Sequence, residues 1–418
     1  MFTPQVIFQI ILFFFVLVTI HEWGHFYFAK RAGILVREFA IGFGPKLFSF
    51  KRGETRYTLR LLPIGGFVRM AGEDPEIVQI QPGQTIGIRL DGRTVTHLVL
   101  DRLENRTDLV IGTVQFIDIE EALRLEIEHD GAVEHYSVHP QAMMVAREKE
   151  NQIAPLDRQF GSKTVGQRAL AIFAGPFMNF VLAFVLFVTV VFLTGVAQNV
   201  KIDGVEADSP AQKAGLLAGD IIKQVDNTTI GSSSRPLINL IQASPDKKMQ
   251  WVVDRAGKEV KLEVTPTNNN GTILVGVRLI SDKRSASFGD AISIGWSTMS
   301  DAARNILQGF KMLVLGQFKM EDLGGPVKII QVTGEHASAG LPQYIFWAAI
   351  MSLYLGMFNL LPFPALDGSR ILFLIFEAIR GKPVDPNRES MVHFIGFAML
   401  MLLMIAVTYN DILQLIRG

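Results

Sequence analysis

The residues best suited to chemistry form one pentapeptide, His21-Glu22-Trp23-Gly24-His25. Residues four apart share a helix face, so both imidazoles can bind one metal ion. The intervening carboxylate of Glu22 then points toward a water on that metal, as a general base must. Such short motifs recur by chance, and their structural context decides whether they form a site. If that context holds, the pattern predicts a zinc centre that hydrolyses peptide bonds.

The context is an apolar run from Val6 to Ala29, which is long enough to cross a bilayer at about 20 residues per crossing. Ionisable groups inside such a span are costly and indicate function by default. The alternative, that they merely lie at the cytoplasmic membrane interface, is disfavoured by that cost. At about 1.5 Å per residue, His25 lies roughly 8 Å before the Lys30-Arg31 boundary. The site is therefore expected below the cytoplasmic surface, but not at mid-bilayer.

A catalytic zinc site usually has three protein ligands and one water. The chain contains no Cys, which excludes thiolate ligands, disulfides and iron–sulfur clusters. The best third ligand is Asp367, a carboxylate in another apolar span that Pro362 and Pro364 interrupt. The two prolines open the helix, so that backbone and side chains there can line a polar cavity. A second Leu-Asp-Gly at residues 90–92 reads better as a solvated hairpin turn.

These residues constrain the reaction. Zinc lowers the pKa of a bound water to about 7. Glu22 takes the proton of that water and passes it to the leaving amine. Asn359 has two open interpretations: it orients substrate and stabilises the oxyanion, or it caps the unwound helix. Water is expected to enter from the nearby cytoplasmic side.

Four stretches are apolar enough to span a membrane, in a chain with 49% hydrophobic residues and mean hydropathy +0.29. They run over residues 6–29, 169–197, 344–379 and 391–407. An even number of spans places both termini on one side. Lys and Arg gather after the first span and in the connector before the fourth, so these segments are expected to be cytoplasmic. The formal net charge of +0 gives no indication of a nucleic-acid partner.

The predicted fold class is a polytopic α-helical membrane protein with four transmembrane helices, a cytoplasmic membrane-associated β-rich insert and one extracytoplasmic globular module. The expected divisions are a first helix with HExxH at 1–30, the β-hairpin region at 31–165, a second helix at 166–197, the module at 198–281, an amphipathic helical region at 282–343, a third helix with Leu-Asp-Gly at 344–380, a connector at 381–390 and a fourth helix at 391–418.

The soluble-looking parts carry turn signals. Alternating residues from Thr55, followed by a turn at residues 63–66, predict a hairpin over 55–70. Asp91-Gly92 and Asp130-Gly131 predict two further hairpin turns, although residues 73–150 suggest no function. In the 282–343 region, apolar residues recur every three or four positions. That amphipathic helix either lies on the outer membrane surface or packs on the module or the spans.

Three motifs in order resemble the site-2 protease family of intramembrane metalloproteases. They are HEWGH in the first span, GPFMN at 175–179 in the second and NLLPFPALDG at 359–368 in the third. The module at 198–281 looks like the PDZ domain that these proteins carry, and residues 323–327 resemble a motif of the bacterial members. The similarity runs over most of the chain.

The resemblance implies a zinc centre in a bacterial plasma membrane, with ligands His21, His25 and Asp367 and with Glu22 as base. The Lys and Arg distribution predicts that both termini and the PDZ domain are extracytoplasmic, with membrane lipid around the spans. Substrates would be single-pass membrane proteins, either anti-sigma factors already trimmed outside by a first protease or remnant signal peptides. The hairpin would hold substrate as an added strand. We assign substrate binding to Asn359, Pro362, Pro364, Gly65 and Gly66.

Two other classes of protein deserve comparison. A metal transporter also places His and carboxylates in spans, but it predicts ligands spread along several helices. This sequence instead concentrates them in one HExxH and one distant Asp. A non-catalytic membrane scaffold that presents its PDZ module leaves Glu22 unexplained, because a structural metal site needs no base. The protease interpretation explains all of these residues.

Overall fold

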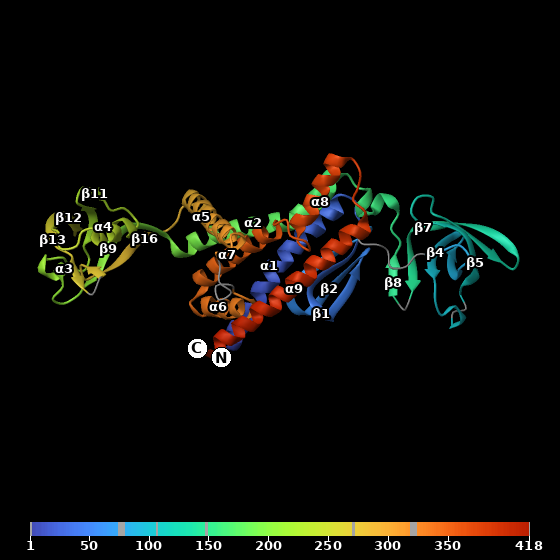
Figure 1. Ribbon diagram of the computed structural model, residues 1–418, viewed down its shortest axis with the longest axis horizontal. Coiled ribbons are helices and arrows are strands. Elements are labelled where there is room, and N and C mark those ends of the chain that lie inside the picture. The colour runs from blue at the N-terminus through green and yellow to red at the C-terminus, as the bar shows by residue number, and fades with distance from the viewer. Residues whose placement is uncertain are drawn as a thin grey trace. The chain divides into compact units, whose positions relative to one another are not determined.

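The computed structural model describes residues 2–73, 80–105, 108–146, 149–269, 272–317 and 324–417 (Figure 1). The chain forms two compact units, one of residues 1–186 with 299–418 and the other of residues 187–298. Leu323, the first residue of the predicted 323–327 motif, lies outside the described residues. Each unit is described by itself below.

Four helices of the described chain are long and apolar enough to cross a membrane. They are α1 (Pro4–Arg31), α2 (Val165–Thr194), α7 (Leu341–Asn359) and α9 (Pro386–Arg417). Thr3 caps α1, and its hydroxyl accepts a hydrogen bond from the Val6 N–H at 3.4 Å. The fourth helix begins five residues earlier than the predicted 391, inside the expected connector.

The third predicted span is interrupted where its two prolines lie. Helix α7 ends at Asn359, and α8 (Asp367–Arg380) begins eight residues later, which leaves the seven residues 360–366 without regular helix. Asp367 is the first helical residue of α8. A Cβ on Gly368 would lie 2.3 Å from the Leu360 carbonyl oxygen, so only glycine allows this close return of the chain.

The two helices directly before α7 in the sequence are α5 (Phe288–Val314) and α6 (Pro326–Ser338). Asp411 of α9 caps α6 by accepting hydrogen bonds from the backbone N–H groups of Gly325 at 3.1 Å and Lys328 at 3.0 Å. Phe2 lies against Gly334 of α6, so both ends of the chain lie beside this helix (Figure 1). This agrees with an even number of spans.

The contacts of the amphipathic helix α5 bear on whether it lies on the membrane surface or packs on the module or the spans. Its Phe310 ring packs on Tyr354 and Phe358 of α7, with ring centroids 5.5 and 6.3 Å apart. Trp296, nearer the start of α5, is 62% exposed. The C-terminal half of the helix therefore packs on a span.

A sheet of two long strands follows α1 and contains the predicted hairpin segment 55–70. A turn at Gly53 joins strands β1 (Val36–Arg52) and β2 (Thr55–Met70). Residues 38–41 of β1 pair with residues 66–69 of β2 in antiparallel register and with residues 56–59 in parallel register. The chain therefore reverses direction between residues 59 and 66, as the predicted turn at 63–66 requires, and Gly65 with φ +79° lies in this reversal. The two arms do not pair with each other as in a simple hairpin, because residues 38–41 lie between them.

Residues 85–152 form a small closed β-barrel within the first unit. Its strands are β3 (Thr85–Asp91), β4 (Thr94–Val99), β5 (Val110–Asp118), β6 (Arg124–His129), β7 (Ala132–Ala146) and β8 (Lys149–Gln152). The order is β4-β3-β5-β6-β7-β8, and β4 also pairs with β7. The turns predicted at Asp91-Gly92 and Asp130-Gly131 join β3 to β4 and β6 to β7. Short 3₁₀ helices lie at Leu103–Asn105, Leu156–Arg158 and Phe160–Ser162.

The second unit is a β-sheet module with two short helices. Its elements are β9 (Val196–Val205), α3 (Pro210–Lys213), β10 (Ile221–Val225), β11 (Thr228–Thr229), α4 (Arg235–Gln242), β12 (Met249–Arg255), β13 (Lys258–Val264), β14 (Thr267–Asn269), β15 (Thr272–Leu274) and β16 (Val277–Arg284). The main sheet has the order β13-β12-β10-β9-β16 around a core that contains the fully buried Trp251. Ser209 caps α3, and its hydroxyl accepts a hydrogen bond from the Gln212 N–H at 3.2 Å.

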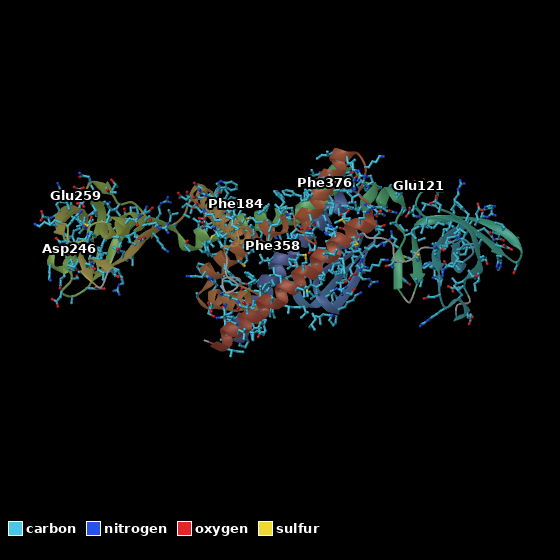
Figure 2. The ribbon with its side chains drawn as sticks, viewed as in Figure 1. Glu121, Phe184, Asp246, Glu259, Phe358 and Phe376 are labelled. Atoms are coloured by element: carbon cyan, nitrogen blue, oxygen red, sulfur yellow. The ribbon has the colours of Figure 1, made fainter. Side chains whose placement is uncertain are left out.

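Figure 2 labels side chains of the helices and of the β-rich parts. In Figure 2 the labelled acidic residues Glu121, Asp246 and Glu259 lie on the β-rich parts. Phe184, Phe358 and Phe376 lie on helices α2, α7 and α8.

Candidate metal centre

Three ionisable side chains from two distant parts of the chain meet at one point. The Nε2 atoms of His21 and His25 lie 3.2 Å apart. Asp367 Oδ2 lies 3.3 Å from His21 Nε2 and 3.4 Å from His25 Nε2. The two histidines are each 8% exposed. In the described chain, this is the group of three His or carboxylate side chains that could hold a metal ion.

The three atoms fit a zinc ion. Tetrahedral coordination with bonds of about 2.05 Å places ligand atoms about 3.3 Å from one another. The three observed separations lie within 0.1 Å of that spacing, at 3.2, 3.3 and 3.4 Å. Asp367 Oδ2 is buried and accepts no hydrogen bond, which is costly without a cation. Two imidazoles and one carboxylate are also a donor set typical of catalytic zinc.

Helix α2 contacts the His25 ring on its Nδ1 side, away from the atom that faces Asp367. His25 Nδ1 donates a hydrogen bond to the Ala171 carbonyl oxygen at 2.9 Å, which leaves the Nε2 lone pair free for a metal. Gly24 packs on the same turn, where an added Cβ would lie 2.3 Å from the Ala174 carbonyl oxygen. A Cβ on Gly175 would lie 2.2 Å from His25 Nε2. Glycine on both helices therefore permits their close crossing.

The side chain of Glu22 faces the β1–β2 sheet. A Cβ on Gly66 would lie 2.8 Å from Glu22 Cγ and 3.1 Å from Val18 Cγ1. Glu22 is 8% exposed, so this carboxylate is covered by the strand. Of the two glycines assigned to substrate binding, Gly66 thus contacts the residue predicted to act as base, and Gly65 lies against the Phe43 ring.

The remaining predicted residues lie in the segment that leads to Asp367. Asn359 ends α7, and the exposed Pro362 follows it. Pro364 packs on α9, where a Cβ on Gly396 would lie 2.2 Å from Pro364 Cβ. His393 Nδ1 accepts a hydrogen bond from the Ala365 N–H at 3.0 Å. Sequence reasoning gave His393 no role, because a lone histidine carries no spacing signal.

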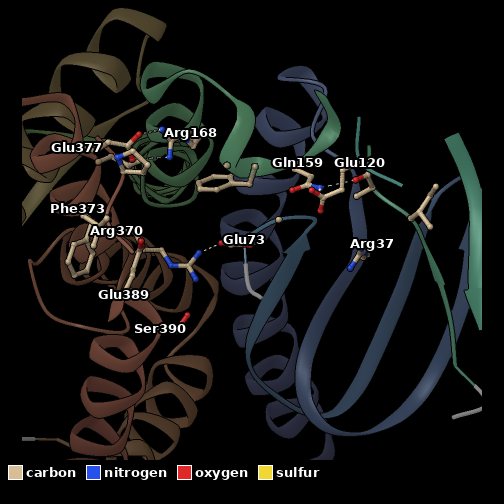
Figure 3. A pocket seen from close by; sticks show the side chains of 18 of the residues that line it. Arg37, Glu73, Glu120, Gln159, Arg168, Arg370, Phe373, Glu377, Glu389 and Ser390 are labelled. Atoms are coloured by element: carbon tan, nitrogen blue, oxygen red, sulfur yellow. Dashed lines mark hydrogen bonds and ion pairs between the residues drawn. The ribbon is translucent and has the colours of Figure 1, made fainter. Parts of the chain in front are cut away.

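A cavity lined in part by Arg370, Phe373 and Glu377 of α8 is separate from this centre (Figure 3). Its volume is about 780 Å³. Neither Asp367 nor any of the three ionisable residues of the HExxH motif lines it. Ion pairs between Arg168 and Glu377 and between Arg370 and Glu73 cross its wall (Figure 3). Arg370 follows Asp367 on α8 by three residues, so the cavity approaches the centre along that helix.

Four apolar helices with a buried HExxH and a distant carboxylate define a membrane-embedded metallopeptidase. The model of Peptidase family M50 matches residues 9–403. The chain therefore belongs to peptidase family M50, and it is an intramembrane zinc metalloprotease.

Named relatives support this membership over nearly the whole chain. The chain is 41% identical to "Zinc metalloprotease RasP" of Oceanobacillus iheyensis, over 97% of this chain and 98% of that protein. It is 42% identical to "Regulator of sigma-W protease RasP" of Bacillus subtilis, over 97% of both chains. It is 38% identical to "Probable protease eep" of Enterococcus faecalis, over 98% of this chain and 99% of that protein.

Solved structures match smaller parts. The PDZ domain of an SdrC-like protein from Listeria monocytogenes shares 25% identity, covers 20% of this chain and 87% of that one, and has a TM-score of 0.18. A serine endoprotease from Yersinia pestis shares 14% identity, covers 49% and 67%, and has a TM-score of 0.15.

Proposed function

We propose that His21, His25 and Asp367 hold the zinc ion and that Glu22 is the general base in hydrolysis of peptide bonds within transmembrane segments. The observation that carries this proposal is the set of donor separations between 3.2 and 3.4 Å among three buried or half-buried side chains. Zinc, when bound there, supplies Lewis-acid polarisation of water and of the scissile carbonyl.

Glu22 follows His21 directly and precedes His25 by three residues, so its carboxylate emerges beside the two imidazoles. It accepts the proton of the attacking water and returns it to the amine that leaves. The covering strand at Gly66 keeps bulk water from this carboxylate. The wall of helices around it keeps the reacting bond in a water-poor environment, where such charges act most strongly.

The substrate helix must unwind before one of its bonds is cut. In a bilayer, the freed backbone groups need partners, and pairing with a strand supplies them. The contact of Gly66 with Glu22 supports residues 65–66 as the part of β2 along which substrate is held. Pro362, Pro364 and Asn359, in the open segment before Asp367, would line the other side of the substrate.

We infer that the substrates are single-pass membrane proteins that another protease has already shortened outside the membrane. The name of the Bacillus subtilis relative, a regulator of sigma-W, supports anti-sigma factors, and remnant signal peptides are a second substrate class. The cluster of Lys and Arg after α1 favours a bacterial plasma membrane orientation with both termini outside. Residues 198–281 would then be an extracytoplasmic PDZ domain.

The decisive test follows cleavage of a shortened single-span substrate in liposomes by mass spectrometry, with wild type and Glu22→Gln compared. Loss of the base is expected to lower the rate at least about 10²-fold while zinc content stays unchanged. Cleavage within the span by wild type alone supports the proposal. Equal cleavage by both would remove Glu22 from the mechanism. Failure of both to cut, with zinc bound, would favour a transporter or scaffold.

A further inference from the structure

Helix α2 carries one buried polar side chain that the proposed reaction does not use. Asn179 is 0% exposed, although it lies in the middle of an apolar span. A primary amide in such a place is costly unless it has a partner. Its amide nitrogen Nδ2 lies 3.2 Å from His21 Nδ1, while its amide oxygen Oδ1 is buried without a hydrogen bond.

We propose that Asn179 is a positioning residue, whose side chain accepts a hydrogen bond from the His21 Nδ1–H and so fixes that ring for metal binding. The assignment rests on the proposed zinc centre. When His21 Nε2 binds a metal, the neutral ring carries its proton on Nδ1 and must donate it. With Nδ2 facing the ring, the Asn179 amide N–H and the His21 Nδ1–H would be two donors facing each other without an acceptor. A 180° rotation of the amide puts Oδ1 at the same place and resolves the conflict.

The backbone around Asn179 fits this role. Its carbonyl oxygen accepts a hydrogen bond from Ser352 Oγ of α7 at 2.8 Å, which ties this turn of α2 to a second helix. Ala171, Gly175 and Asn179 recur every four residues and therefore share one face of α2. Ala171 accepts from His25, Gly175 leaves room for the same ring, and Asn179 contacts His21. One helix face thus supports both histidines.

Three substitutions of Asn179 distinguish a positioning role of its side chain from a packing role. Loss of a partner behind a metal-bound histidine typically weakens metal affinity about 10- to 100-fold. Asn179→Ala removes the acceptor and should weaken zinc binding by that factor. Asn179→Asp keeps an acceptor of nearly the same shape and should bind zinc as tightly as wild type. Asn179→Leu keeps the volume without the acceptor and should behave like Asn179→Ala.

The test uses the full chain in detergent micelles, equilibrated with chelator-buffered free zinc, and measures bound zinc by elemental analysis. Cobalt replaces zinc in a parallel series, because its visible spectrum reports ligand geometry directly. Gly166→Ala is the matched control, since it changes the same helix at a position where a Cβ meets nothing within 4 Å. Wild type, Asn179→Asp and Gly166→Ala are expected to bind zinc equally tightly. Asn179→Ala and Asn179→Leu are expected to bind it more weakly and to show altered cobalt spectra.

Other outcomes overturn the assignment. Zinc affinity of Asn179→Ala equal to that of wild type would show that the amide does not support the ring. Equal losses in folded Asn179→Asp and Asn179→Ala would show a packing role only. If Asn179→Ala fails to fold, a tenfold loss in folded Asn179→Asp would have the same meaning. A wild-type chain that binds no zinc would overturn the proposed metal centre itself, which no variant result can imitate.

Discussion

Single residues at the centre show that glycine matters there as much as the ionisable side chains do. Gly24 and Gly175 each face backbone or ring atoms at distances that no Cβ tolerates, 2.3 Å to the Ala174 carbonyl oxygen and 2.2 Å to His25 Nε2. Gly368 meets the end of α7 in the same way. The metal ligands are therefore held by close backbone approaches, and a single methyl group is enough to displace one.

Gly175→Ala should place its methyl group inside the His25 ring and push that ring off the metal. A displacement on the order of 1 Å at a reacting centre typically costs about 10²-fold in rate. We expect such a loss in the liposome cleavage assay, together with reduced zinc content. Gly166→Ala, on the same helix but with nothing within 4 Å, is the matched control and should cleave normally. Equal activity of both variants would contradict the observed contact.

At the scale of elements, α9 acts on the site without supplying a ligand. Gly396 of α9 packs against Pro364. His393 of α9 accepts a hydrogen bond at Nδ1 from the Ala365 N–H at 3.0 Å. Ala365 has φ +76°, a conformation that costs energy for a residue with a side chain and needs support from its neighbours. Helix α9 therefore stabilises the bend that delivers Asp367 to the two histidines.

Gly396→Leu should force α9 away from Pro364 and release this bend. Asp367 would then leave the two imidazoles, and we expect cleavage to fall about 10²-fold with a parallel fall in bound zinc. Leu402→Ala, at a position of α9 that is 68% exposed, controls for a general effect on this helix. Full zinc content in a folded Gly396→Leu variant would mean that α9 does not hold the segment.

At the scale of the whole molecule, one carboxylate joins the β1–β2 turn to the barrel. Glu54 accepts hydrogen bonds from Arg158 Nη2 at 2.8 Å and from Gln152 Nε2 at 2.8 Å. The Arg158 hydrogen bonds lower the pKa of Glu54 to about 2, which outweighs the opposing effect of its partial burial. The ionised form of Glu54 is thus favoured by the folded state.

Because the folded pKa of Glu54 is depressed, its contribution to stability is fully present above the ordinary value of 4.5 and is lost as the pH falls toward about 2. The melting temperature of wild type should therefore fall more between pH 5 and pH 3 than that of Glu54→Gln, which cannot titrate. Glu104→Gln, at an exposed position of the barrel, should fall as wild type does. Parallel curves for wild type and Glu54→Gln would contradict the role of this carboxylate.

The second unit permits a clean deletion, because Val196 of β9 is paired with Arg284 of β16. A short Gly-Ser linker in place of residues 197–283 should therefore leave the first unit folded. If this module excludes substrates that are still intact outside, the deletion variant should cleave an untrimmed substrate that wild type leaves uncut. Trimmed substrate, cleaved equally by both proteins, is the control. Unchanged selectivity would count against a filter at this place.

The sequence by itself determined the features that depend on neighbouring residues. Helical spacing put His21, Glu22 and His25 on one turn, local hydropathy marked the four spans, and the two prolines marked the break before Asp367. It also predicted the turns at Asp91-Gly92 and Asp130-Gly131. Each of these depends on residues within a few positions of one another, so a single sequence contains the whole signal.

Only the tertiary structure decided which distant segments meet. The contacts of His25 with Ala171 and of His21 with Asn179 join residues 146 and 158 positions apart. No local pattern gives such pairs, although an amide in an apolar span was a signal that something must face it. The same holds for the 55–70 segment, because alternation marks a strand but not its partner. Pairing and close approach arise from packing across the whole fold, which is why the surroundings of His21 became visible only there.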